Sequence, residues 1–132
     1  MEIDNSIPEN KLSYIIRGAA FTVYNNLGPG LLESVYVAAL AYELNLLGNK
    51  VRTEVGVPLI YGDIKLDQGY RLDILVDDLV IVEVKSVELV NDVHRKQLLT
   101  YLKLSGKRLG LLINFNSADL SKSIERIVLN LY

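Results

Sequence analysis

The sequence predicts an α/β or α+β sandwich built around one mixed β-sheet. Two amphipathic helical patterns come first, a group of apolar strands follows, and a helix, a strand and a last helix complete the chain. This order of elements places helices against the faces of a single sheet. With 132 residues, the chain is long enough for one domain with its own hydrophobic core. Residues 1–10 are expected to be a loose N-terminal lead-in to that domain.

Two helices are predicted in the N-terminal third. From Leu12 to Leu27, apolar residues recur with the i, i+3, i+4, i+7 spacing of an amphipathic helix. Gly28 and Pro29 end this helix, because glycine supplies a left-handed cap and proline cannot continue the helix. The second helix begins just after Gly30 and ends at Gly48. Its expected apolar stripe is Leu31, Leu32, Val35, Tyr36, Ala39, Leu40, Leu44 and Leu47.

The middle of the chain predicts several strands. Residues 51–61 form one or two of them, and Gly56 and Pro58 favour an edge position or a bulge. Gly62 and Asp63 predict a turn, followed by a short returning strand at residues 64–66. Two apolar runs, 72–76 and 79–84, then predict a hairpin around a tight turn at residues 77–78.

The last third predicts a helix, a strand and a helix. Asn91 and Asp92 are suitable N-caps for a helix over about 93–105, which Gly106 ends. Residues 109–115 predict a short buried strand. Ser117 is then expected to cap a last helix over 120–129, whose inward residues are Leu120, Ile124, Ile127 and Val128.

Composition excludes several classes of protein. The absence of cysteine excludes a disulfide framework and a zinc–thiolate site. A polar, acidic N-terminus and the lack of a long apolar run argue against a signal peptide and a membrane span, so we expect a cytoplasmic protein without a membrane partner. A net charge of −2 argues against a protein that coats nucleic acid by neutralising phosphates. It does not exclude a nuclease, because acidic metal ligands lower the charge and the bound cation restores it.

Three charged residues interrupt the apolar hairpin: Asp73, Glu83 and Lys85. Carboxylates and ammonium groups are rarely buried unless they pair or bind a metal. Glu83 and Lys85 are two residues apart, so their side chains share one face of a strand. A two-residue turn would place Asp73 opposite Val82, whereas one extra residue would place Asp73 opposite Glu83. We predict the second register, because bulges recur beside active sites.

In that register the hairpin predicts a metal site. Two facing carboxylates repel each other unless a cation lies between them. Carboxylate oxygens suit Mg²⁺ or Mn²⁺, which also bridge to substrate phosphates. Lys85 could then orient and polarise a water molecule, or stabilise charge on the phosphate under attack. The alternative is an ion-pair network in which Lys85 and Arg71 simply neutralise Asp73 and Glu83.

Two other groups of residues are candidates for the same site. His94, Gln97 and Tyr101 share one face of the predicted helix over 93–105. Gln97 and Tyr101 could reach a phosphate or a base, but singly they suit a solvated residue and a core aromatic, and His94 suits a helix cap. Glu33 and Tyr36 share a face of the second helix. The alternatives are an acid that complements the helix dipole and a core aromatic.

Five motifs in a fixed order carry a family resemblance: GLLESVY, GYRLDILV, VIVEVKSVE, HRKQLLTYL and GLLINF. From about Leu12 to Leu129 the chain resembles the GxxExxY protein family of the PD-(D/E)XK nuclease-like superfamily. The resemblance implies a restriction-endonuclease-like sandwich, a central mixed β-sheet flanked by helices, as a single nuclease-like domain over residues 1–132.

The resemblance also implies roles for the acidic and basic residues. Asp73 matches the aspartate of the superfamily's first strand, and Glu83 and Lys85 match its ExK pair. Glu33 matches the acid of the first core helix. In the family these acids hold Mg²⁺, with the Val84 carbonyl as a further ligand, and the lysine assists the attacking water.

Gln97 and Tyr101 resemble the QxxxY motif of the RecB-like branch, which lies on the substrate side of the site. One departure is Leu72, which stands where the superfamily's name has proline.

Two functional hypotheses follow. The first is a metal-dependent nuclease that hydrolyses phosphodiester bonds of nucleic acid, with DNA as the expected substrate. The second is a non-catalytic module that binds nucleic acid or protein on the same fold. A homodimer is a possible working unit, because so small a domain covers little of a duplex. The basic residues that could gather on one side are Lys50, Arg52, Arg95, Lys96, Lys103, Lys107 and Arg108.

Overall fold

A five-stranded mixed sheet forms the centre of the computed structural model, which describes residues 3–57, 59–66 and 70–131. The strands lie in the order β1 (Val51–Gly56), β4 (Arg71–Val76), β5 (Val80–Lys85), β6 (Leu109–Asn114) and β7 (Ile124–Val128). Only β5 and β6 are parallel; the other neighbours are antiparallel. β1 lies at one edge of the sheet, one of the two alternatives that the sequence predicts for this segment.

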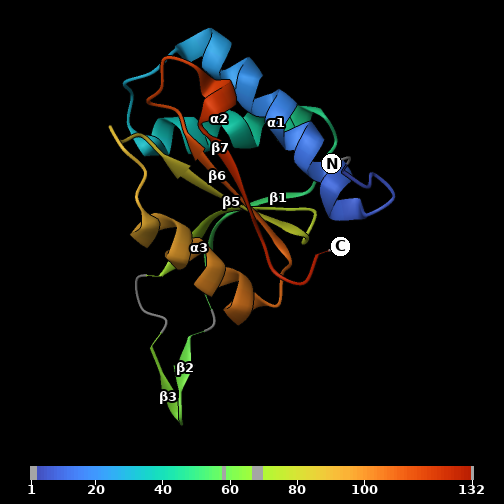
Figure 1. Cartoon of the computed structure of the whole chain (residues 1–132), viewed down its shortest axis with the longest axis vertical. Helices are drawn as coiled ribbons and strands as arrows, with labels where there is room; N and C mark the ends of the chain where they lie inside the picture. The colour runs from blue at the N-terminus through green and yellow to red at the C-terminus, as the bar shows by residue number, and fades with distance from the viewer. Residues whose placement is uncertain (1–2, 58, 67–69, 132) are drawn as a thin grey trace.

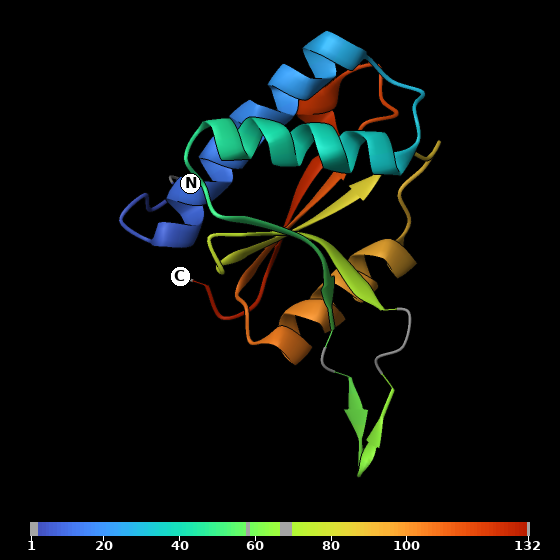
Figure 2. The same cartoon turned by 180° about the vertical axis from the view of Figure 1, so that it is seen from behind.

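Helices cover both faces of this sheet (Figure 1). α1 (Pro8–Leu27) and α2 (Glu33–Leu46) lie on one face, and α3 (Asp92–Ser105) lies on the other. Figure 2 shows the same three layers from behind. Gly110 permits the close approach of α3, because a Cβ there would lie 2.8 Å from a Leu98 side-chain carbon. The predicted α/β sandwich around a central mixed sheet is confirmed.

The strands alternate between the two layers. Even-numbered residues of β5 pack against α1 and α2, whereas Ile81 packs against α3. By the period of two, Glu83 and Lys85 project toward the α3 side. No helix in the described part of the chain is long and apolar enough to cross a membrane.

α1 begins four residues earlier than the sequence pattern predicts. It starts at Pro8, and Glu9 and Asn10 are buried, so the end of the expected lead-in belongs to the helix. Proline suits the first turn of a helix, where its missing N–H costs nothing. The Glu9 carboxylate accepts two hydrogen bonds from Arg108, at 2.7 and 2.8 Å, which explains how this acid is buried. The end of α1 at Leu27, next to Gly28 with φ 68°, agrees with the prediction.

α2 begins at Glu33 rather than directly after Gly30, and its predicted stripe is only partly buried. The residues of the stripe that are buried are Tyr36, Leu40 and Leu44, whereas Leu31, Leu32, Val35 and Leu47 are exposed. The reason is that the turn after Gly30 extends through Leu32, so the first two leucines precede the helix.

The predicted last helix is wrong. A single 3-10 turn, η1 (Leu120–Lys122), is followed by strand β7, which pairs with β6. The side chain of Asp119, not Ser117, caps that turn by accepting the N–H of Ser121. β-Branched residues in IERIV favour a strand, and its side chains alternate in direction. Arg126 bonds to Asn10 and Ser13 on α1, whereas Glu125 bonds to Arg95 on α3.

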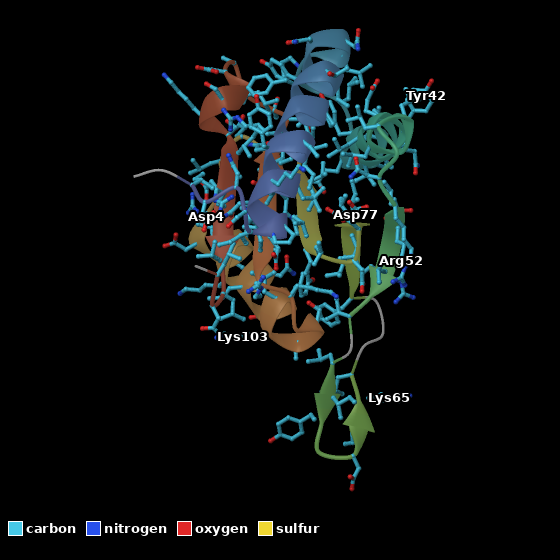
Figure 3. All side chains as sticks on the ribbon, turned by 90° about the vertical axis from the view of Figure 1, so that its right-hand side faces the viewer. Asp4, Tyr42, Arg52, Lys65, Asp77 and Lys103 are labelled. Carbon is cyan, nitrogen blue, oxygen red and sulfur yellow. The ribbon has the colours of Figure 1, made fainter. Side chains whose placement is uncertain are left out.

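β2 (Ile60–Tyr61) and β3 (Ile64–Lys65) form a separate two-stranded arm. The arm projects away from the body of the molecule, with Lys65 on it (Figures 1 and 3). The predicted turn at residues 62–63 and the returning strand are confirmed. Pro58, which the sequence associated with a bulge, lies outside the described residues.

Candidate active site

The β4–β5 hairpin has the register that places Asp73 opposite Glu83. The paired residues are Val76–Val80, Leu75–Ile81 and Ile74–Val82. Residues 77–79 form the three-residue connection that sets this register. Asp77 and Asp78 both adopt positive φ, 52° and 56°. The Asp77 carboxylate accepts hydrogen bonds from the Lys50 N–H at 2.7 Å and the Asn49 amide at 2.9 Å. The bulged register predicted from the sequence is therefore confirmed.

The backbone pairing of β4 with β5 ends next to the two acids. Beyond Ile74–Val82, the N–H of Val84 donates to Asp73 Oδ2 at 2.8 Å, and the N–H of Asp73 lies 3.3 Å from Glu83 Oε1, which accepts it. Carboxylate oxygens thus replace carbonyl oxygens as acceptors where the strands part. These bonds fix both carboxylates at the gap between the strands.

The backbone changes direction at the same level of the sheet. Leu72 packs in the same apolar cluster as Leu75, so the alternation of β4 is interrupted around Asp73. In the neighbouring strand β1, Glu54 lies between the partners of Leu72 and Ile74 and has φ 54°. A non-glycine residue with this φ is uncommon in a strand. The distortion carries β4 away from β5 and opens the site.

Burial makes both carboxylates difficult to ionise. Glu83 is only 5% exposed, and burial together with the charge of Asp73 raises its pKa to about 8. Burial also raises the pKa of Asp73, although the Val84 N–H and the charge of Lys85 oppose that shift. The charge of Lys85 opposes the shift of the Glu83 pKa but does not cancel it. Without a cation between them, the two acids therefore do not ionise together readily.

Lys85 and Arg71 do not neutralise these acids by direct ion pairs. Within residues 3–57, 59–66 and 70–131, the ion pairs are made by Arg95, Lys107 and Arg108 with other acids. The ion-pair network considered as an alternative is therefore not formed. A buried and a half-buried carboxylate without a basic partner at contact distance form a donor set that fits a hard divalent cation.

Glu33 lies at the start of α2 and reaches the end of β5. Its Oε2 accepts the N–H of Ser86 at 3.0 Å, and the Ser86 hydroxyl donates to the carbonyl of Leu31 at 2.6 Å. The charge of Glu33 contributes to the raised pKa of Asp73, so the two acids interact. One oxygen of Glu33 is thus engaged by the backbone. Accordingly, no group of three or more acidic, histidine or cysteine side chains is arranged to hold a metal among the described residues.

Ser86 is the residue of this site that sequence reasoning missed. It joins the turn before α2 to the strand that carries Glu83 and Lys85. A serine after a strand gives no distinct signal in the sequence. Its position directly after Lys85 is the only feature that could have drawn attention to it.

Tyr36 is fully buried and supports the turn before α2. Its hydroxyl donates to the carbonyl of Gly28 at 2.6 Å and accepts the N–H of Leu31 at 3.1 Å. Its ring stacks on Phe115, with the centroids 4.5 Å apart. Tyr36 therefore acts on the site through the turn that it holds, rather than from its surface.

α3 contributes the other predicted residues. Tyr101 is buried, and its pKa is raised by burial and by the charges of Glu83 and Asp73. Gln97 is half-buried one turn earlier on the same helix face. His94 closes a capping box, in which its Nδ1 accepts the N–H of Asn91 at 3.3 Å. Its cap role agrees with the alternative considered for it.

The site is accessible from outside. Glu33, Asp73 and Lys85 are half-buried, and Glu83 lies deeper between the strands. Two facing carboxylates thus lie at this end of β5, and the charges of Lys85 and Glu33 act on Asp73. Such a group can bind a cation and hold a negatively charged substrate beside it.

Comparison with known families agrees with this arrangement. The sequence profile of the PD-(D/E)XK nuclease superfamily matches residues 10–127, which is nearly the whole chain. Searches of curated proteins and of solved structures returned no match. Members of the superfamily typically use divalent metals, and a nuclease-type function implies a nucleic-acid substrate. On the extent of this match and the fold described above, the chain belongs to the PD-(D/E)XK nuclease superfamily.

Proposed function

We propose that the protein is a divalent-metal-dependent nuclease of the GxxExxY branch that hydrolyses phosphodiester bonds in the cytoplasm. DNA is the expected substrate, and Mg²⁺ is the expected metal, with Mn²⁺ as a substitute. The observation that carries the proposal is the pair of carboxylates of buried Glu83 and half-buried Asp73, which face each other where two strands part and make no ion pair with the described residues. A stable core alone would not require such a pair.

The acids and one backbone group hold the metal in this proposal. Asp73 and Glu83 are direct ligands, the Val84 carbonyl is a further oxygen ligand, and Glu33 completes the acidic cluster through water. Glu33 suits the indirect role, because one of its oxygens already accepts the N–H of Ser86. When bound, the metal polarises a phosphoryl oxygen and lowers the pKa of water.

The remaining residues act on the water and the substrate. Lys85 donates hydrogen bonds that orient the attacking water and stabilise charge on the phosphate. The water oxygen forms a bond to phosphorus while the bond from phosphorus to the leaving oxygen breaks. Gln97, Tyr101 and His94 contact the substrate from α3, and Tyr36 supports the turn that carries Glu33.

Cleavage assays on single-stranded, duplex and branched DNA and on RNA, with Mg²⁺ or Mn²⁺, test this function. The wild-type chain is expected to cleave at least one of these substrates, and EDTA is expected to stop cleavage. Asp73→Ala and Lys85→Ala should each abolish metal-dependent cleavage. Lys11→Ala is the matched control, because Lys11 is exposed on α1, away from the acids. Unchanged cleavage by Asp73→Ala or Lys85→Ala would remove the mechanism.

One observation favours the second candidate, a non-catalytic module that binds nucleic acid or protein. No set of three metal-binding side chains is preassembled in the part of the chain that the structure describes. Of the basic residues that could contact nucleic acid, Arg95, Lys107 and Arg108 are engaged in ion pairs. Binding of nucleic acid by a wild-type chain that cleaves none of the substrates would support this candidate.

A homodimer is proposed as the form that covers a longer stretch of duplex. Sedimentation velocity at several protein concentrations, with and without DNA, measures this directly.

A further inference from the structure

An apolar hollow lies beside the candidate active site. It has a volume of about 540 Å³, and we call it the α2 hollow; its lining residues are Gly30, Leu31, Leu32, Val35, Ser86 and Asn116. Leu32 is 74% exposed, and Leu31 and Val35 are exposed as well. Three aliphatic side chains around the hollow thus leave apolar surface in contact with water. Covering that surface with a ligand would be favourable.

Ser86 connects the α2 hollow to Glu33 of the candidate site. Ser86 belongs to both: its N–H donates to Glu33 Oε2, and its hydroxyl donates to the carbonyl of Leu31, which lines the hollow. Ser86 also directly follows Lys85 in the chain. In the proposed complex, a phosphate beside Lys85 and the cation held by the acids would bring its neighbouring nucleotide to this edge of the hollow.

The chemistry of the lining selects one part of a polynucleotide. Phosphate and sugar are charged or polar, whereas the faces of the bases are apolar. In a duplex those faces are stacked on each other, and only an unpaired base can offer them to a protein pocket. Leu31, Leu32 and Val35 suit the faces of a base, and the carboxamide of Asn116 suits its hydrogen-bonding edge.

We propose that the α2 hollow binds an unpaired nucleobase next to the scissile phosphate, so that the chain acts on single-stranded or frayed nucleic acid in preference to continuous duplex. The proposal rests on the proposed nuclease function and adds the class of substrate to it. Leu32 is the residue whose side chain the base is expected to cover.

The test combines a protein variant with a change in the substrate. The cleavage position in a single-stranded oligonucleotide is mapped first. Versions of that oligonucleotide with an abasic nucleotide on either side of the position are then compared, because they keep the phosphates and remove one base. An abasic nucleotide on one of the two sides is expected to raise KM by about five- to tenfold, in line with the contribution of one stacked base.

Leu32→Ala is expected to raise KM for the intact oligonucleotide by a similar factor, with kcat unchanged. The variant should lose nothing further on the abasic substrate, because the same contact is already absent. Leu46→Ala is the matched control: Leu46 is 65% exposed at the opposite end of α2 from Leu32 and does not line the hollow. Binding of the labelled oligonucleotides to Lys85→Ala protein, measured by fluorescence anisotropy, should show the same pattern without cleavage.

Several results would overturn the proposal. These are additive effects of Leu32→Ala and the abasic nucleotide, an equal effect of Leu46→Ala, or equal KM values for single-stranded and duplex DNA. Concentration-dependent self-association that Leu32→Ala abolishes would assign the hollow to a second copy of the chain. If the chain cleaves the oligonucleotide but the effects of Leu32→Ala and the abasic nucleotide are additive, the base subsite is rejected and the nuclease function stands. A wild-type chain that cleaves nothing rejects the nuclease function and the subsite together.

Discussion

The two ends of the β4–β5 hairpin satisfy the backbone N–H groups of the strands with different acceptors. Near the turn, Val76–Val80 and Ile74–Val82 pair through the backbone, and their side chains are buried and apolar. One residue beyond Ile74, the carboxylates of Asp73 and Glu83 accept the backbone N–H groups instead. The closed end stabilises the fold, while the open end places buried acids where a cation can bind. Stability and function are thus separated along a single pair of strands.

Without a metal, the two acids at the open end destabilise the folded state. Both acids have raised pKa values because of burial, and the charge of Asp73 raises the pKa of Glu83 further. Buried like charges destabilise a fold unless something compensates for them. Changes at the open end should therefore alter activity and the pH response, and changes at the closed end should alter stability alone.

The largest effect is expected from Glu83→Gln at the open end. The amide keeps an acceptor for the Asp73 N–H but removes a metal ligand, so kcat/KM should fall on the order of 10³-fold. In EDTA at pH 8 the same variant should melt at a higher temperature than the wild type, because a buried charge is absent. Steady-state kinetics and thermal melts measure the two quantities. A variant that is fully active, or less stable in EDTA, would contradict the comparison.

The second effect concerns the stability of the metal-free protein across the pH range. Glu83 has a pKa of about 8 in the folded chain, against an ordinary value of 4.5, and the pKa of Asp73 is also raised. The folded state therefore holds its protons more tightly than the unfolded state does. The contribution is fully present below pH 4.5 and is lost as the pH rises through about 8.

Urea unfolding in EDTA between pH 4.5 and pH 8 measures this loss, which should amount to a few kcal/mol. Glu83→Gln is the control and should flatten most of the slope. A saturating divalent cation should also reduce it, because the cation stabilises the ionised form. A wild-type chain that becomes more stable over this range would show that the two carboxylates are not buried together.

The third effect isolates the turn at the closed end. Asp77→Ala removes acceptors for Lys50 and Asn49, and should lower the free energy of unfolding by about 2 kcal/mol. Asp78→Ala is a matched control, because Asp78 has nearly the same φ but makes only an ion pair with Lys107 at the surface. Urea unfolding of both variants gives the difference. The comparison would fail if the two substitutions cost the same.

The smallest effect is expected from Ile74→Val, one residue from Asp73. The loss of one buried methylene should cost about 1 kcal/mol, and kcat should change less than twofold because no group of the site is altered. Ile113→Val, which is equally buried on β6, is the control. A tenfold fall in kcat with Ile74→Val alone would show that packing and catalysis are not separated at this boundary.

The register of the hairpin was predictable because two acids in apolar strands have few acceptable positions. Facing each other around a cation is one of them, and the structure has that register. Glu33 could be expected near the site, but its bond to Ser86 could not. That contact joins residues 53 apart in sequence, and neither residue carries a local signal for it.

The end of the chain was not predictable from periodicity alone. Ile124 and Ile127 fit the apolar stripe of a helix. They also fit a strand in which Ile124 and Arg126 face one side of the sheet and Glu125 and Ile127 face the other. The partners that decide between these patterns, Arg95 on α3 and Asn10 on α1, are far away in the sequence. Tertiary contacts thus override a local pattern that is compatible with both structures.

The β2–β3 arm leaves the sheet from β1 and β4, which remain paired up to Gly56 and Arg71. A change in the length of the connection between those two residues should therefore leave the distance between the carboxylates of Asp73 and Glu83 unchanged. Exposed connections of this kind tolerate insertions. A fluorescent reporter domain inserted at the arm's tip, between residues 62 and 63, should therefore report where the protein is in cells without altering the candidate site.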